Sequence, residues 1–153
     1  MPQLVSLAAY SIKLWNESDR DLETLSDFDG EGADLLNSLK DILEHIKDNT
    51  LDQKELQQAL SVTKVAQNSR ILAGIIETGE YGRESTIISV ETKKPVYHRK
   101  TQDAEMWPFY FYIEIPEGAE AGLLILQRTS ALGIRKVPSD PRGYRMKRTV
   151  EVD

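Results

Sequence analysis

Apolar residues recur with a period of three to four in one part of this chain and with a period of two in several others. Between 33 and 47 the helical period forms one apolar stripe, made of Leu35, Leu36, Leu39, Ile42, Leu43 and Ile46. A weaker stripe follows Thr50 and Gln53, whose spacing is that of a capping box. These patterns predict two helices, over 33–47 and 51–60.

Alternating apolar and polar positions predict strands on both sides of the helical segments. The expected strands cover 4–15, 70–78, 84–91, 96–100, 109–115, 123–128 and 132–137. Gly74, inside one of them, indicates a bulge or a close backbone approach. Pro108 is expected to end an acidic loop at 101–108.

The order of these elements predicts an α+β fold. We expect an antiparallel sheet of about five to seven strands with both helices packed on one face. Residues 1–137 would form a single domain, and 138–153 a basic C-terminal tail. This tail is either a mobile arm or, through the segment 148–152, an additional edge strand.

Composition narrows the classes of function. The 153 residues include no cysteine, which excludes disulfides, thiolate metal sites and cysteine nucleophiles. The longest apolar runs are far shorter than a membrane span, and the N-terminus fits a signal peptide poorly. We therefore expect a cytoplasmic protein without a membrane partner.

Charge is unevenly distributed along the chain. Residues 1–60 hold five Lys/Arg and thirteen Asp/Glu, whereas residues 61–153 hold fourteen and twelve. The segment 142–148 has four cations and no acid. Such a distribution favours a polar protein or nucleic-acid partner, although the overall charge of −6 disfavours nonspecific DNA binding.

The strand 109–115 has an aromatic face that suggests a binding surface. Tyr110 and Tyr112 would lie on one side of it, opposite Phe109, Phe111, Ile113 and Ile115. Two tyrosines in this alternation resemble a stacking platform for single-stranded nucleic acid, and they also suit simple packing or a protein-binding face. The cations expected near the sheet or its strand ends are Arg99, Lys100, Arg128, Arg135 and Lys136.

A second interpretation places catalysis between 97 and 105. A metal-dependent nuclease needs carboxylates to hold Mg²⁺ and a basic group to assist the attacking water. His98, Asp103 and Glu105 are the candidates for these roles. Solvated charge at a hairpin explains the same residues, and we favour that explanation.

The acidic segment 16–32 contains part of a calcium-loop pattern. Asp27, Asp29 and Glu31 stand at positions one, three and five of an EF-hand loop, with a glycine at position six. Position twelve is Ser38, which cannot replace the bidentate glutamate of such loops. We therefore favour an acidic linker before a helix, and we predict no cofactor.

Three stretches resemble a known group of proteins. They read "RILAGIIETGEYGRESTIISVETKKPVYHRK" (70–100), "DAEMWPFYFYIEIPEG" (103–118) and "GLLILQRTSALGIRKV" (122–137). Together they resemble the front part of uncharacterised bacterial proteins from anti-phage defence islands. The resemblance covers under half of the chain, implies an α+β module that senses or binds a partner, and supplies no catalytic residues.

The sequence thus favours a non-enzymatic binding module, linked by the resemblance to bacterial phage defence. Its partner would be a protein or a nucleic acid, bound through the sheet face and the basic strand ends. The alternatives are the small metal-dependent nuclease and an assembly role, in which copies of the chain associate through an exposed sheet edge.

Overall fold

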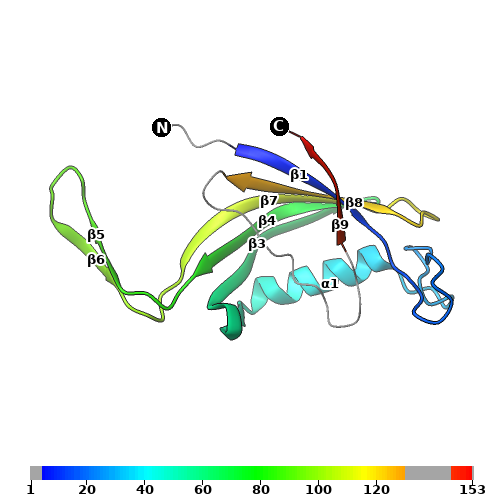
Figure 1. Cartoon of the computed structure of the whole chain (residues 1–153), viewed down its shortest axis with the longest axis horizontal. Coiled ribbons are helices and arrows are strands. Elements are labelled where there is room, and N and C mark those ends of the chain that lie inside the picture. Colours follow the sequence, from blue (N-terminus) through cyan, green and yellow to red (C-terminus); the bar gives the residue numbers. More distant parts are fainter. Residues whose placement is uncertain (1–4, 130–145, 153) are drawn as a thin grey trace.

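The computed structural model describes residues 5–129 and 146–152, and within them one α-helix packs against one face of an antiparallel sheet (Figure 1). The sheet has seven strands in the order β2-β3-β4-β7-β8-β1-β9. Their bounds are β1 Val5–Ile12, β2 Leu51–Gln53, β3 Gln58–Asn68, β4 Ile71–Glu80, β7 Glu105–Glu114, β8 Gly122–Thr129 and β9 Met146–Val152. The predicted α+β class and antiparallel sheet are confirmed.

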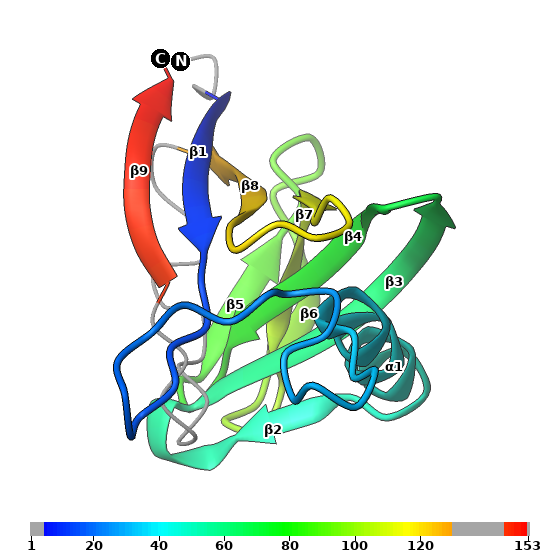
Figure 2. The same cartoon turned by 90° about the vertical axis from the view of Figure 1, so that its right-hand side faces the viewer.

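The first predicted helix is confirmed as α1, Leu35–Asp48. Asp34 caps it, because its Oδ1 accepts the backbone N–H of Leu36 at 3.0 Å. The apolar stripe faces β3 and β4, and Leu36 is completely buried there. Figure 2 shows α1 lying across the half of the sheet formed by these strands.

The predicted helix over 51–60 is wrong. The segment forms a tight hairpin, in which β2 pairs with the start of β3 around a 3-10 turn, Lys54–Leu56. Gln57 adopts a positive φ of 49°, which ends the turn. The capping-box spacing is a local signal, and the long ladder between β3 and β4 outweighs it.

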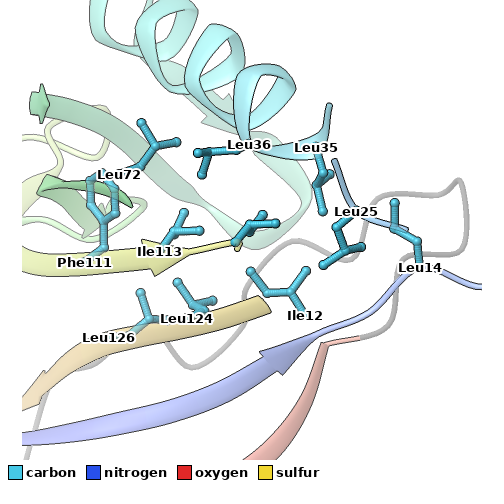
Figure 3. Close-up of a cluster of buried hydrophobic side chains, with 11 residues drawn as sticks. Ile12, Leu14, Leu25, Leu35, Leu36, Leu72, Phe111, Ile113, Leu124 and Leu126 are labelled. Carbon is cyan, nitrogen blue, oxygen red and sulfur yellow. The ribbon is translucent and has the colours of Figure 1, made fainter. Parts of the chain in front are cut away.

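The core lies between α1 and the inner face of the sheet (Figure 3). The expected strand faces are confirmed, since Ala8, Ile12 and Leu14 share one buried side of the N-terminal segment. The β7 strand and its end bury their odd-numbered residues from 109 to 115. Each buried aliphatic or aromatic side chain of this kind contributes about 1.5–3 kcal/mol of stability.

The long acidic connection after β1 is anchored by an apolar residue. Leu25 is completely buried in the core beside Leu14 and Leu35. Its backbone N–H donates to the carbonyl of Ala119 at 2.9 Å, and its own carbonyl accepts from Leu35 at 2.8 Å. The connection therefore covers the end of the core that α1 leaves open.

Residues 101–108 are expected to form a loop that ends at Pro108. In the structure, strand β7 begins at Glu105 and includes Pro108. Tyr110 donates its backbone N–H to Oε1 of Gln127 on β8, so even-numbered residues of β7 direct their backbone groups to that side. The β7–β8 ladder covers only 111–114 on β7. The backbone nitrogen of Pro108 therefore points to the side on which the described ladder requires no N–H donor at this residue. Proline, which has no N–H, tolerates such a position.

The predicted hairpin over 84–100 is confirmed, but it leaves the main sheet. Strands β5, Ser85–Ile88, and β6, Pro95–Arg99, pair only with each other and project as an arm from the ends of β4 and β7 (Figure 1). We call residues 83–100 the arm.

Part of the expected tail belongs to the sheet. Strand β9 pairs antiparallel with β1, in agreement with the edge-strand alternative for 148–152. The expected strand over 132–137 lies outside the described residues, as do the candidates Arg135 and Lys136.

Candidate partner-binding surface

The sheet face turned away from α1 displays apolar and aromatic side chains. We call it the open face, and it is formed by outward-pointing residues of β1, β8, β7 and β4: Leu7, Ala9, Leu123, Ile125, Tyr110, Tyr112, Ala73 and Ile75. Tyr110 is 64% exposed, Leu7 49% and Leu123 37%. Ala9, Ile125, Tyr112 and Ala73 lie opposite one another across four adjacent strands, whereas Leu7 lies opposite Gln127, and Leu123 lies opposite Ser11 and Glu114.

Acidic groups border the open face. On β1, β3, β4, β7 and β8, the charged residues with this orientation are Glu77, Glu114 and one cation, Lys64. The Tyr112 hydroxyl donates to Oε2 of Glu114 at 3.0 Å, and this bond raises the pKa of Tyr112. A phosphate approaching the aromatic strand would therefore meet negative charge, whereas an apolar protein surface would not be repelled.

The predicted cations do not gather around the tyrosines. Arg128 shares the strand side of Leu124 and Leu126, opposite to the open face. Arg99 and Lys100 lie at the base of the arm. Tyr110 and Tyr112 thus lie on one side of β7, as alternation predicts, and Arg128 lies on the opposite side of the sheet.

Arg99 connects the arm to the main sheet. Its Nε donates to the Asp103 carbonyl at 3.1 Å, Nη1 to Oε2 of Glu105 at 3.2 Å, and Nη2 to the Glu80 carbonyl at 2.9 Å. Only 14% of its side chain is exposed. The guanidinium is therefore engaged with its own chain, since it holds β6 against the end of β4 and the start of β7.

Replacing Arg99 with methionine is expected to loosen the arm without unfolding the domain. The variant keeps the aliphatic stem but loses all three donors, and the two-stranded ribbon has little stability of its own. Backbone amides of residues 85–99 should exchange with solvent at least about tenfold faster, while global stability changes by about 1 kcal/mol or less. Lys93→Met is the control, and equal exchange rates in both variants would contradict this role of Arg99.

The nuclease candidates do not form a metal site. Asp103 accepts the Tyr97 hydroxyl at 2.6 Å and the backbone N–H of Lys100 at 2.9 Å, and these bonds lower the pKa of Asp103. Glu105 binds Arg99, and Nδ1 of His98 lies 3.4 Å from the Thr86 hydroxyl. Within 5–129 and 146–152, no three His, Asp or Glu side chains lie close enough to hold a metal ion.

The calcium-loop pattern forms a self-capped turn. Asp27 accepts the backbone N–H of Gly32 at 2.7 Å, and Asp29 accepts those of Glu31 and Ala33 at 2.8 and 3.0 Å. These backbone bonds lower the pKa of Asp29. The carboxylates of Asp27 and Asp29 thus shape the approach to α1, as the linker interpretation expects.

A small hollow of about 180 Å³ lies where the arm leaves the sheet. Gln58, Thr78, Arg99, Glu105 and Trp107 are among the residues that line it. Gln58 donates to the buried Thr78 hydroxyl at 2.9 Å, and Arg99 is engaged as described above. The hollow is smaller than the about 300–1,000 Å³ of typical ligand pockets, and the sequence patterns did not indicate it.

The exposed apolar residues of the arm are a candidate surface that the sequence patterns did not indicate. Ile87 pairs with Tyr97 across the ribbon, and Ile88 pairs with Pro95 beyond a register shift that lies beside Val96. With Val90 at the tip, these side chains are 45–86% exposed. Apolar residues at both odd and even positions of one short hairpin were the signal that could have revealed them.

Comparison with known proteins found no match among protein-family models, curated proteins or solved structures. The resemblance of residues 70–137 to defence-island proteins therefore stays a prediction. In the described part of the chain, no helix has the length and apolar character needed to cross a membrane.

Proposed function

We propose that this protein is a non-enzymatic binding module that recognises another protein through the open face. The observation that carries the proposal is a set of three large exposed side chains, Tyr110, Leu7 and Leu123, around the apolar row from Ala9 to Ala73 on one sheet face. Exposed apolar residues that cluster in this way are typical of interaction sites. Tyrosine adds a rigid ring to such a surface at a low cost in conformational entropy.

A protein partner is favoured over a nucleic acid because of the charges on this face. A single-stranded platform combines stacking rings with cations that follow the phosphates. Here the rings lie beside Glu114 and Glu77, and Tyr112 donates its hydroxyl to Glu114. The cytoplasmic location and the role in phage defence are further parts of the proposal, and the second rests on the resemblance of residues 70–137 alone.

Photo-crosslinking in cells that produce the protein tests the proposal. A crosslinking residue in place of Tyr110 or Leu123 should give one discrete protein adduct, because both positions lie in the proposed contact. The same residue in place of Ile42, an exposed apolar position on α1, is the matched control. Leu7→Lys should abolish the Tyr110 adduct. Equal adducts at Ile42, or an adduct that is insensitive to Leu7→Lys, would contradict the proposal.

A salt series with single-stranded and double-stranded DNA and RNA tests the nucleic-acid alternative. We expect Tyr110→Ala to leave any measured Kd unchanged. A base stacked on this ring would contribute about 1–3 kcal/mol, so its loss would weaken binding about fivefold or more. A weakening of that size, together with a steep dependence on salt, would favour the stacking platform instead.

A further inference from the structure

Beyond Arg99 at its base, the arm projects away from the domain, and its apolar side chains are exposed. Ile87 pairs with Tyr97 across the ribbon, and the adjacent positions on the two strands, Ile88 and Val96, are also apolar. All four are at least 45% exposed, and Val90 at the tip is 86% exposed. A water-facing ribbon needs no such residues, and an isolated two-stranded hairpin is marginally stable by itself. This composition therefore suits a ribbon that contacts another surface.

We propose that the arm of one copy of this protein packs on the open face of a second copy, whose arm packs back on the first. This inference rests on the proposed function, because it names the protein that occupies the open face. Each copy contributes both an exposed apolar ribbon and an exposed apolar sheet face. In a two-fold pair the same two surfaces meet twice, and the contact is closed.

Charge complementarity supports a second copy as the occupant. Residues 83–100 contain five Lys/Arg and two Glu, and Arg83, Lys93, Lys94 and Lys100 are exposed. The open face is bordered by Glu77 and Glu114, and the segment 16–34 holds eight acids and one Arg. That segment lies at the opposite end of the molecule from the arm (Figure 1). A basic arm is therefore attracted to the rest of another copy, whereas two arms repel each other.

The size of the two surfaces favours reciprocal packing. A stable protein interface uses about 20–30 residues on each side. The arm alone has eighteen residues, and some of these necessarily face away from any one partner surface. When each of two copies contributes both its arm and its open face, the interface reaches the standard size. A single arm on a single open face gives an interface below that size.

Analytical ultracentrifugation of the complete chain over a wide range of concentration tests this inference. We expect a reversible monomer–dimer equilibrium that shifts towards monomer as salt is raised. Ile88→Thr combined with Val96→Thr should weaken the dimer about tenfold or more, because both changes remove apolar contact while keeping β-branched residues in the ribbon. Thr92→Ser at the arm tip is the matched control and should leave the dimer intact.

A mixing experiment separates this arrangement from other dimers. Leu7→Lys combined with Leu123→Lys should also weaken the dimer, because it places cations on the open face opposite a basic arm. The arm variant carries Ile88→Thr and Val96→Thr, and the face variant carries Leu7→Lys and Leu123→Lys. When the two are mixed in equal amounts, the unchanged arm of the face variant can pack on the unchanged open face of the arm variant. The mixed dimer therefore retains one intact arm–face contact. The mixture should form this heterodimer at concentrations where each variant alone is monomeric. Thermal unfolding of both variants verifies that the domain remains folded.

Two results would overturn the inference. One is a monomer at every concentration, and the other is a dimer that neither pair of substitutions weakens. If the chain is monomeric while Tyr110 still gives a Leu7-sensitive adduct with a different protein, the second copy is excluded and the proposed function stands. If neither a dimer nor an adduct forms, both proposals fail.

Discussion

Replacing Gly74 with alanine is expected to destabilise the protein by about 3 kcal/mol or more, enough to unfold many domains of this size. A Cβ at this position would lie 1.9 Å from the carbonyl oxygen of Lys64 and 2.9 Å from Cε1 of Phe111. The closer atom belongs to the backbone of β3, next to the register shift between Val62 and Lys64. Relief of the clash would therefore separate β3 from β4, and the core residue Phe111 limits movement on the other side.

Urea denaturation followed by circular dichroism measures this effect. The matched control is Ala73→Ser, which enlarges the preceding side chain of β4 on the open face. We expect the control to remain within about 0.5 kcal/mol of the wild type, as most surface substitutions do. A loss below about 1 kcal/mol for Gly74→Ala would show that β3 can move away at little cost, and would contradict the close approach seen here.

The importance of Gly74 could be inferred from the sequence, because a glycine inside an otherwise apolar strand indicates a bulge or a close approach. The same local logic correctly assigned the buried and exposed sides of β7. Phe111 and Ile113 face the core while Tyr110 is exposed, as alternation along a strand requires. The structure therefore confirms the inferences that depend only on the alternation of residues within one strand.

Inferences that depend on neighbouring strands did not hold equally well. Residues 51–60 have a helical signal, and their strand pairing depends on β4, which begins eleven residues after that segment ends. Residues 101–108 are expected to form a loop that Pro108 ends, because the sequence does not show which edge of β7 lacks a ladder partner at this position. In both cases the deciding contact is remote in sequence, so a local pattern could not reveal it.

The candidate site shows the same division. The tyrosine face followed from alternation, whereas Arg99 was assigned to a partner although it binds Glu105 and two backbone carbonyls of its own chain. Nothing in the hairpin pattern predicts that β5 and β6 leave the main sheet. The apolar residues of the arm become a candidate surface only once that departure is known.

The second large effect is expected from Asp34→Ala, which should lower the free energy of unfolding by about 2–3 kcal/mol. Asp34 caps α1 and also accepts hydrogen bonds from both terminal nitrogens of the Arg70 guanidinium, Nη1 and Nη2, of which Nη2 donates to Oδ1 at 3.0 Å. Nε of Arg70 donates to the Ile115 carbonyl at 2.7 Å. The carboxylate thus joins the start of the helix to the β3–β4 turn and the end of β7.

Chemical denaturation of Asp34→Ala measures the loss, and Asp41→Ala, at an exposed position of the same helix, is its control. Both changes remove one carboxylate from the helix region, so only the cap and the bond to Arg70 distinguish them. The side chains of Asp34 and Arg70 are 13% and 26% exposed, and this remaining contact with water keeps the expected loss below that of a fully buried pair. Equal stability of the two variants would contradict the connection.

Acid titration tests the same contact without removing the carboxylate. The Arg70 hydrogen bond holds the pKa of Asp34 below its ordinary value, so the unfolded chain binds a proton at this group more readily than the folded protein. Its contribution is therefore complete above the ordinary carboxyl pKa of about 3.9 and disappears as the pH falls through the lower folded pKa. Arg70→Met should be less stable than the wild type at neutral pH, and the difference should narrow on acidification. A difference that stays constant down to low pH would assign the stability to packing of the arginine stem instead of to the charged hydrogen bond.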